Sequence, residues 1–167
     1  MWKFLDNNRG LSLIELVVTL TILIILSSLI LPSAQMAAKR TKEIELRRNL
    51  REIRTAIDDY KKYDDKIQSE QKGQQGLTGP SQETGYPETL EVLVEGHDFG
   101  GLAKSKKKFL RRIPRDPFHK TEGDDPAWGM RSHDDEPDSS SWGGQDVFDV
   151  YSLSKGTAID GTKYEDW

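Results

Sequence analysis

The chain has 167 residues, which is enough for one domain together with an anchoring segment. It contains no cysteine, so thiol catalysis, disulfide bonds and cysteine zinc sites are excluded. A net charge of −4 excludes the overall basicity of a typical nucleic-acid binder. The mean hydropathy of −0.69 indicates a polar chain with a small core. A small domain without disulfides needs other support, such as oligomerisation or a bound metal.

Residues 1–10 are expected to form a cytoplasmic leader peptide. Lys3 and Arg9 outweigh Asp6 there, and positive charge before an apolar segment keeps that end of a chain in the cytoplasm. No A-x-A cleavage pattern follows the next, apolar segment, so that segment is expected to stay in the mature protein.

Residues 11–32 form an apolar run, predicted to be the transmembrane half of a long helix. A helix of this length would extend roughly 30 Å, about one hydrocarbon core. Glu15 lies one turn inside the run. A carboxylate deep in a membrane costs about 2.5–3.5 kcal/mol, which favours a functional role. The alternative is a glutamate whose head group reaches the interface.

Residues 33–72 are predicted to form the amphipathic half of the same helix. Apolar side chains follow steps of three and four residues along it. These are Leu46, Leu50, Ile53, Ile57, Tyr60 and, seven residues on, Ile67. Pro32 removes one backbone hydrogen bond and should kink the helix rather than end it. The glycine-rich segment 73–80 should end it, which predicts one helix from about Leu11 to about Ser69.

The charges of the amphipathic half are segregated. Residues 39–54 carry seven basic and three acidic side chains, and residues 58–70 carry five acidic and three basic ones. One interpretation is a solvated helix face with pairs four residues apart. The other is that staggered parallel copies place a basic segment of one chain beside an acidic segment of the next.

Two charged runs of opposite sign follow in the third part of the chain, residues 73–167. Residues 104–115 carry seven basic side chains and no acid, and residues 122–138 carry seven acids and one arginine. The basic run could bind nucleic acid or another anionic surface. Alternatively, the two runs are solvated loops that balance each other, which is the interpretation that the equal charges favour.

The remaining pattern predicts a small globular α+β part within residues 73–167. A short helix is expected near residues 86–94, with Leu90, Leu93 and Val94 on one face. Residues 146–153 are rich in strand formers, and residues 127–132 are a plausible partner strand. The predicted fold class is therefore α+β: a long N-terminal helix, kinked near Pro32, packed on a small antiparallel β-sheet.

No pattern of residues indicates catalysis. The three histidines have no metal-hydrolase spacing, no G-x-S-x-G motif is present, and the glycines of residues 71–85 lack the spacing of a phosphate-binding loop. We therefore predict a structural subunit and not an enzyme.

The N-terminal segment resembles the class III signal of type IV pilins and pseudopilins. The resemblance rests on Gly10 after a basic leader, on Leu11-Ser12-Leu13-Ile14-Glu15 and on the proline that closes the apolar run. It implies that a prepilin peptidase cleaves between Gly10 and Leu11 and then methylates the amine of Leu11. It also implies that Glu15 and Leu11 act in assembly, because Glu15 of one subunit is an oppositely charged partner for the amine of another. Leu11 departs from the family, in which the first mature residue is most often Phe.

Three further segments are similar to the major pseudopilin of type II secretion systems, the general secretion pathway protein G family. They are Gly85-Tyr86-Pro87 with the leucines that follow, Arg112 to Phe118, and Phe148 to Leu153 before a loop ending in Trp167. Phe118 in place of Trp and an enlarged acidic insert at residues 119–142 are departures.

The resemblance implies a subunit that polymerises into a helical pseudopilus of a type II-like secretion system. Its partners would be copies of itself, the prepilin peptidase, the inner-membrane assembly platform, minor pseudopilins and membrane lipid, with no nucleic acid expected. It would cross the inner membrane once, with a cytoplasmic N-terminus and a periplasmic globular part. The alternatives are a type IV pilin or DNA-uptake pseudopilin forming a surface fibre, and a monomeric membrane-anchored periplasmic binding domain.

The resemblance also implies a Ca²⁺ ion in the C-terminal loop, held by carbonyls and carboxylates. The candidate ligands are Leu153, Asp160, Glu165 and Asp166. The positions of the two aspartates of the family are occupied here by Gly156 and Lys163, so the site requires a differently folded loop. The alternative is an ordinary acidic surface loop.

Overall fold

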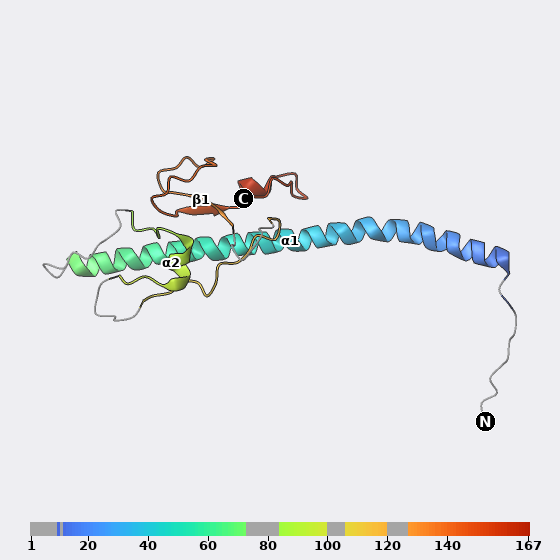
Figure 1. The fold of residues 1–167 in the computed structure, drawn as a ribbon, viewed down its shortest axis with the longest axis horizontal. Coiled ribbons are helices and arrows are strands. Elements are labelled where there is room, and N and C mark those ends of the chain that lie inside the picture. The colour runs from blue at the N-terminus through green and yellow to red at the C-terminus, as the bar shows by residue number, and fades with distance from the viewer. Residues whose placement is uncertain (1–9, 11, 73–83, 100–105, 120–126) are drawn as a thin grey trace, which may run out of the picture. The chain divides into compact units, whose positions relative to one another are not determined.

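The structure is a computed structural model that describes residues 10, 12–72, 84–99, 106–119 and 127–167. Its elements are a long helix α1 (Leu13–Lys72), a short helix α2 (Leu90–Glu95), strands β1 (Gly129–Arg131) and β2 (Asp149–Tyr151), and a 3-10 helix η1 (Tyr164–Asp166) (Figure 1). The chain divides into two compact units, Met1–Arg40 and Thr41–Trp167. The boundaries of α1 lie within three residues of those predicted, and α1 continues through Pro32, whereas α2 begins four residues later than the short helix expected near residues 86–94. The kink stays a prediction.

The part of α1 in the first unit is apolar on all sides. The large apolar side chains between Leu13 and Leu26 are 50–79 % exposed. The hydroxyls of Thr19, Thr21 and Ser28 donate to carbonyl oxygens three or four residues earlier, which satisfies them without water. By length and composition α1 is able to cross a membrane. The assignment of residues 11–32 as a transmembrane segment stays a prediction, and the exposure of these apolar side chains is compatible with it.

The second unit is built on one stripe of α1. The side chains predicted to form it are buried, apart from Ile67, which is half-buried: Leu46, Leu50, Ile53, Ile57 and Tyr60. They form one apolar cluster with side chains of α2 and of the segments around the strands, namely Leu90, Leu93, Leu110, Trp128, Val147 and Val150. Most of the unit's hydrophobic stabilisation comes from covering this stripe, because α2 and the strands are too short to form a core by themselves.

Helix α2 is only six residues long, so its stability depends on packing against its surroundings. Its apolar face consists of Leu90 and Leu93, which are buried, with Val94 half-buried, as predicted. It ends at Gly96, whose positive φ of 87° is a conformation that glycine adopts without strain. The carbonyl oxygen of Leu93 accepts hydrogen bonds from the amides of Phe109 and Leu110, which ties the following segment to the helix.

The sheet has two antiparallel strands, with Met130 opposite Val150. Both strands fall inside the predicted segments but are only three residues long. Gly129 lies against the Tyr151 ring, where an added Cβ atom would overlap ring carbons. The α+β fold class, with a long N-terminal helix and a small antiparallel sheet, is thus confirmed.

Hydrogen bonds join the segments on which the resemblance to pseudopilins was based. The amide of Val147 donates to the Pro87 carbonyl, and the Ser152 hydroxyl donates to the buried Asp116 carboxylate over 2.5 Å. The other carboxylate oxygen of Asp116 accepts from the amides of Phe118 and His119. Asp116 therefore shapes its own turn and attaches it to the segment that follows β2.

Replacing Ile53 by alanine tests whether the buried stripe of α1 stabilises the second unit. Ile53 has an exposed fraction of 0 %, so Ile53→Ala should lower the free energy of unfolding by about 2–5 kcal/mol through lost burial and the cavity left behind. The matched control is Ile44→Ala on the same helix, where 64 % exposure predicts a change within about 0.5 kcal/mol. Tryptophan fluorescence during urea unfolding of the detergent-solubilised chain measures both. Equal effects would contradict the assignment of the core.

Candidate functional site

The first candidate site is the start of α1. Gly10 is exposed, Leu11 lies outside the described residues, and the first helical hydrogen bond joins the Leu16 amide to the Ser12 carbonyl. The predicted cleavage bond, Gly10–Leu11, therefore directly precedes the helix.

Glu15 lies in the first turn of α1 and is exposed. The helix dipole stabilises a carboxylate at this end, by about 0.3–1 kcal/mol. Its neighbours Leu13, Ile14 and Leu16 are apolar and at least half exposed, and the sequence has no other charged residue between Leu11 and Ala38. Within the described residues Glu15 has no partner. A carboxylate in an apolar surrounding needs a cation or hydrogen-bond donors to compensate for its lost hydration.

The second candidate site is the terminal loop (residues 153–167) where it meets α1. Glu43 of α1 is buried and accepts two hydrogen bonds at Oε1: from the Ile159 amide over 2.8 Å and from the Tyr164 hydroxyl over 2.9 Å. Burial raises the pKa of Tyr164 to about 12, and the bond to the Glu43 carboxylate adds to the shift. The hydroxyl therefore remains a donor at neutral pH.

The sequence places Glu43 among charged residues that could form a solvated helix face, and its burial corrects that interpretation for Glu43. A signal was present: Glu43 precedes Leu46 by three residues and so extends the apolar stripe by one step. The pattern marks the face of the helix, but only the structure shows that Tyr164 and the Ile159 amide lie there as donors.

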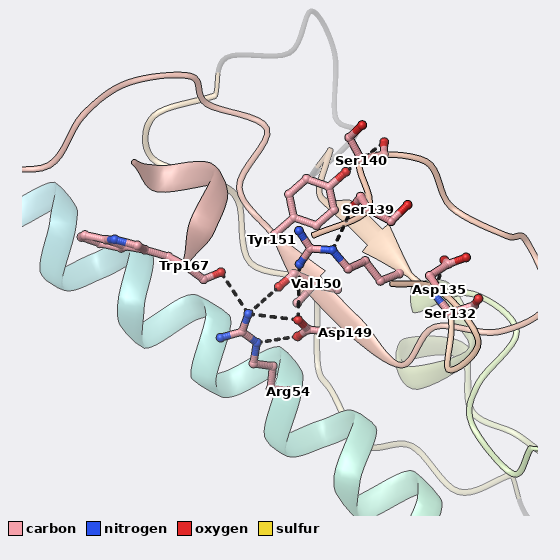
Figure 2. A network of polar contacts seen from close by, with 10 residues as sticks. Arg54, Ser132, Asp135, Ser139, Ser140, Asp149, Val150, Tyr151 and Trp167 are labelled. Carbon is pink, nitrogen blue, oxygen red and sulfur yellow. Dashed lines mark hydrogen bonds and ion pairs between the residues drawn. The ribbon is translucent and has the colours of Figure 1, made fainter. Parts of the chain in front are cut away.

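Two arginines of α1 also bind the terminal loop and β2. Arg47 pairs with Asp160 over 2.9 Å and places its guanidinium 4.0 Å from the centre of the Trp167 ring. Arg54 pairs with Asp149 over 2.6 Å and donates to the carbonyl oxygens of Val150 and Trp167 (Figure 2). Because one guanidinium joins β2 to Trp167, removing it would free both at once.

The predicted calcium ligands do not fit a cation as they are placed. Asp160 accepts from the amide and hydroxyl of Thr162 and pairs with Arg47, contacts that lower its pKa, with Thr162 the main cause. Glu165 pairs with Lys163 over 3.0 Å. In the part of the chain that the structure describes, no three acidic or histidine side chains come together in a way that could hold a metal ion. Calcium binding through Leu153, Asp160, Glu165 and Asp166 stays a prediction of the resemblance.

The three histidines pack against aromatic side chains or are partly exposed. His97 contacts the rings of Tyr60 and Phe99, and His133 stacks on Tyr86 at 5.9 Å. His119 follows the Asp116 turn and donates its amide to that carboxylate. Among the described residues, none of the three belongs to a group of at least three histidine or acidic side chains that could hold a metal ion.

Tyr164→Phe tests the buried contact with Glu43. Loss of a hydrogen bond to a charged group should lower the free energy of unfolding by about 1–3 kcal/mol at neutral pH. The tyrosine loses its proton near pH 10 when unfolded but only near pH 12 in the native state, so its contribution is complete below pH 10. The difference from wild type should therefore shrink between pH 10 and 12.

Urea unfolding of both chains across that pH range measures the difference. Tyr63→Phe is the control, because the Tyr63 hydroxyl makes no hydrogen bond within the described residues. A pH-independent difference would show that Tyr164 contributes only by packing.

Comparison with known proteins adds one finding at the N-terminal site. Residues 5–31 match the family described as the prokaryotic N-terminal methylation motif. No curated protein and no solved structure matches the chain. The match includes Gly10, Leu11 and Glu15 and ends within the apolar part of α1. Together, the motif and the exposed apolar helix support a type IV pilin-like protein and suggest that it is anchored in a membrane.

Proposed function

We propose that the chain is a structural subunit that polymerises into a helical pseudopilus of a type II-like protein secretion system. The observation that carries the proposal is the methylation motif at residues 5–31, which overlaps the first part of α1, where the large apolar side chains between Leu13 and Leu26 are exposed. The subunit would cross the inner membrane once, with its N-terminus in the cytoplasm and residues 73–167 in the periplasm. It would be a substrate of the prepilin peptidase and not itself an enzyme.

Assembly explains why the first unit exposes so much apolar surface. In the membrane these side chains contact lipid, and in a filament they would contact the same helix of neighbouring subunits. The carboxylate of Glu15 and the amine released at Leu11 are four residues apart, so pairing between subunits would set their axial register. The inner-membrane assembly platform and minor pseudopilins would start and drive the polymerisation.

Two other functions make different demands on the molecule. A DNA-uptake or surface-fibre pilin would use the basic run of residues 104–115 on phosphate groups, and its binding would weaken steeply with salt. A monomeric anchored binding domain would not need Glu15, nor would it form filaments.

Processing is the first test. We expect cleavage between Gly10 and Leu11, followed by methylation of the Leu11 amine. Intact-mass measurement and N-terminal peptide analysis of membrane-extracted protein from cells that contain the peptidase should show the loss of residues 1–10 and the added methyl group. A mature chain that still begins at Met1 would overturn the proposal at its first step.

Assembly is the second test. Cells that produce the chain with its assembly machinery should form filaments visible by electron microscopy. Glu15→Leu should insert in the membrane and be cleaved, but its filament yield should fall about tenfold or more, because the Leu11 amine loses its partner in a low dielectric. Thr19→Leu is the control, since it removes another polar side chain from the same exposed segment and should leave the yield unchanged. Normal filaments from Glu15→Leu would refute the pairing.

A further inference from the structure

Four arginines line one cleft of the second unit. Arg48 and Arg51 come from α1, and Arg111 and Arg112 come from the segment after α2. All four are exposed around an open cleft of about 590 Å³, whose floor includes Ala56 and Leu110. None of the four guanidinium groups takes part in an ion pair or hydrogen bond within the described residues. Like charges gathered without a partner destabilise an isolated subunit, so the cleft is suited to a partner that carries negative charge.

A matching group of acids lies in the acidic loop (residues 133–138). It carries Asp134, Asp135, Glu136 and Asp138, of which all but Asp135 are exposed. Asp135 accepts from the amides of Ser132 and Gly143, and these bonds lower its pKa. The loop thus keeps a defined shape while it presents three carboxylates to the outside. Its one ion pair among the described residues joins Asp134 to His133.

The acidic loop does not neutralise the arginine cleft of its own chain. No ion pair joins the two sets within the described residues. The expectation that the full runs of residues 104–115 and 122–138 balance each other stays a prediction, because residues 122–126 lie outside the described part of the chain. In Figure 1 strand β1, which leads into the acidic loop, lies on one side of α1, and the yellow segment that follows α2 lies largely on the other. Since the two patches form no ion pair within the described part of one molecule, their opposite charges are available for contact between molecules.

We propose that the arginine cleft of one subunit receives the acidic loop of the next subunit in the filament. This inference rests on the proposed function and identifies the contact between the globular parts. Contact between two different patches is heterologous, and repetition of a heterologous contact that does not close produces an open helical assembly.

The axial positions of the two patches agree with this arrangement. The acidic loop lies level with Lys61 of α1, because Lys61 lies over the Tyr86 ring, which stacks on His133. The cleft extends along α1 from Arg48 to Asp59. A shift of four residues, about 6 Å, is what pairing of Glu15 with the Leu11 amine requires. A parallel copy whose second unit is displaced by the same four residues would place its acidic loop at the level of Ile57 instead of Lys61, within the cleft.

The cleft suits a protein surface better than a nucleic acid. Glu52 and Asp59 also line it, and they would repel a phosphate backbone. The apolar floor, which includes Ala56 and Leu110, can be covered by protein. Because the charges are exposed, the contact should weaken as ionic strength rises.

Cysteine cross-linking of the full chain tests the contact, and the absence of native cysteines makes the result specific. Thr55 lines the cleft and is exposed, as is Glu136 of the acidic loop. A chain carrying Thr55→Cys and Glu136→Cys should give a ladder of disulfide-linked oligomers when filaments are treated with a mild oxidant. The control carries Lys155→Cys with Glu136→Cys, because Lys155 is exposed but outside the cleft, and it should stay monomeric.

Charge reversal provides the second readout. Arg111→Glu with Arg112→Glu should lower filament yield about tenfold while leaving cleavage and the urea unfolding midpoint unchanged, because like charges would then face each other. Adding Glu136→Arg and Asp138→Arg to the same chain should restore the yield to within about twofold of wild type. Reversal without any effect on yield would overturn the contact.

The outcomes separate this inference from the proposed function. Filaments that form without the cysteine ladder would overturn the contact and leave the pseudopilus proposal in place. Absence of filaments from the unsubstituted chain would overturn both. A salt-sensitive complex with a DNA duplex that is lost in Arg111→Glu, without a cysteine ladder, would instead assign the cleft to nucleic acid and overturn the inference.

Discussion

Burial of one stripe of α1 is the constraint on which the second unit depends. Helix α2 has six residues and each strand has three, and elements so short do not persist without a surface to cover. Ile53 and Ile57 supply that surface, together with their neighbours on the stripe. The rest of the unit is largely loop, so its order comes from side chains that pack on the helix and from specific polar bonds to it.

The side chains that form those polar bonds also lie on α1. Glu43, Arg47 and Arg54 lie at steps of four and seven residues, which places them along one side of α1, and each binds the terminal loop. These bonds attach the last fifteen residues to α1 in a chain that has no cysteine to form disulfide bonds. Of these bonds, the buried ones of Glu43 contribute more than the exposed ion pair between Arg47 and Asp160, because fewer water molecules compete for the same groups.

The described charges thus divide into two groups with different consequences. Some, such as Asp149 and Glu43, are satisfied inside the subunit and shape it. Others have no counterpart within the described residues, as is the case for Glu15 in its apolar surroundings and for the arginine cleft. In a subunit that assembles, charged groups of this kind are suited to contacts between copies. An opposite charge on the neighbouring copy would lower the unfavourable electrostatic free energy of such a group.

The sequence by itself determined the features that depend on local pattern. The boundaries of α1, the buried stripe from Leu46 to Tyr60, the short helix at Leu90 and the locations of both strands follow from periodicity and composition, and the motif at Gly10 and Glu15 is a local signal. Only the tertiary structure decided which charged residues are buried and that Arg54 joins β2 to Trp167. The physical reason is that a charged residue has the same local pattern whether its partner lies in water, elsewhere in the chain or on another molecule. Its role therefore depends on what distant segments bring to it.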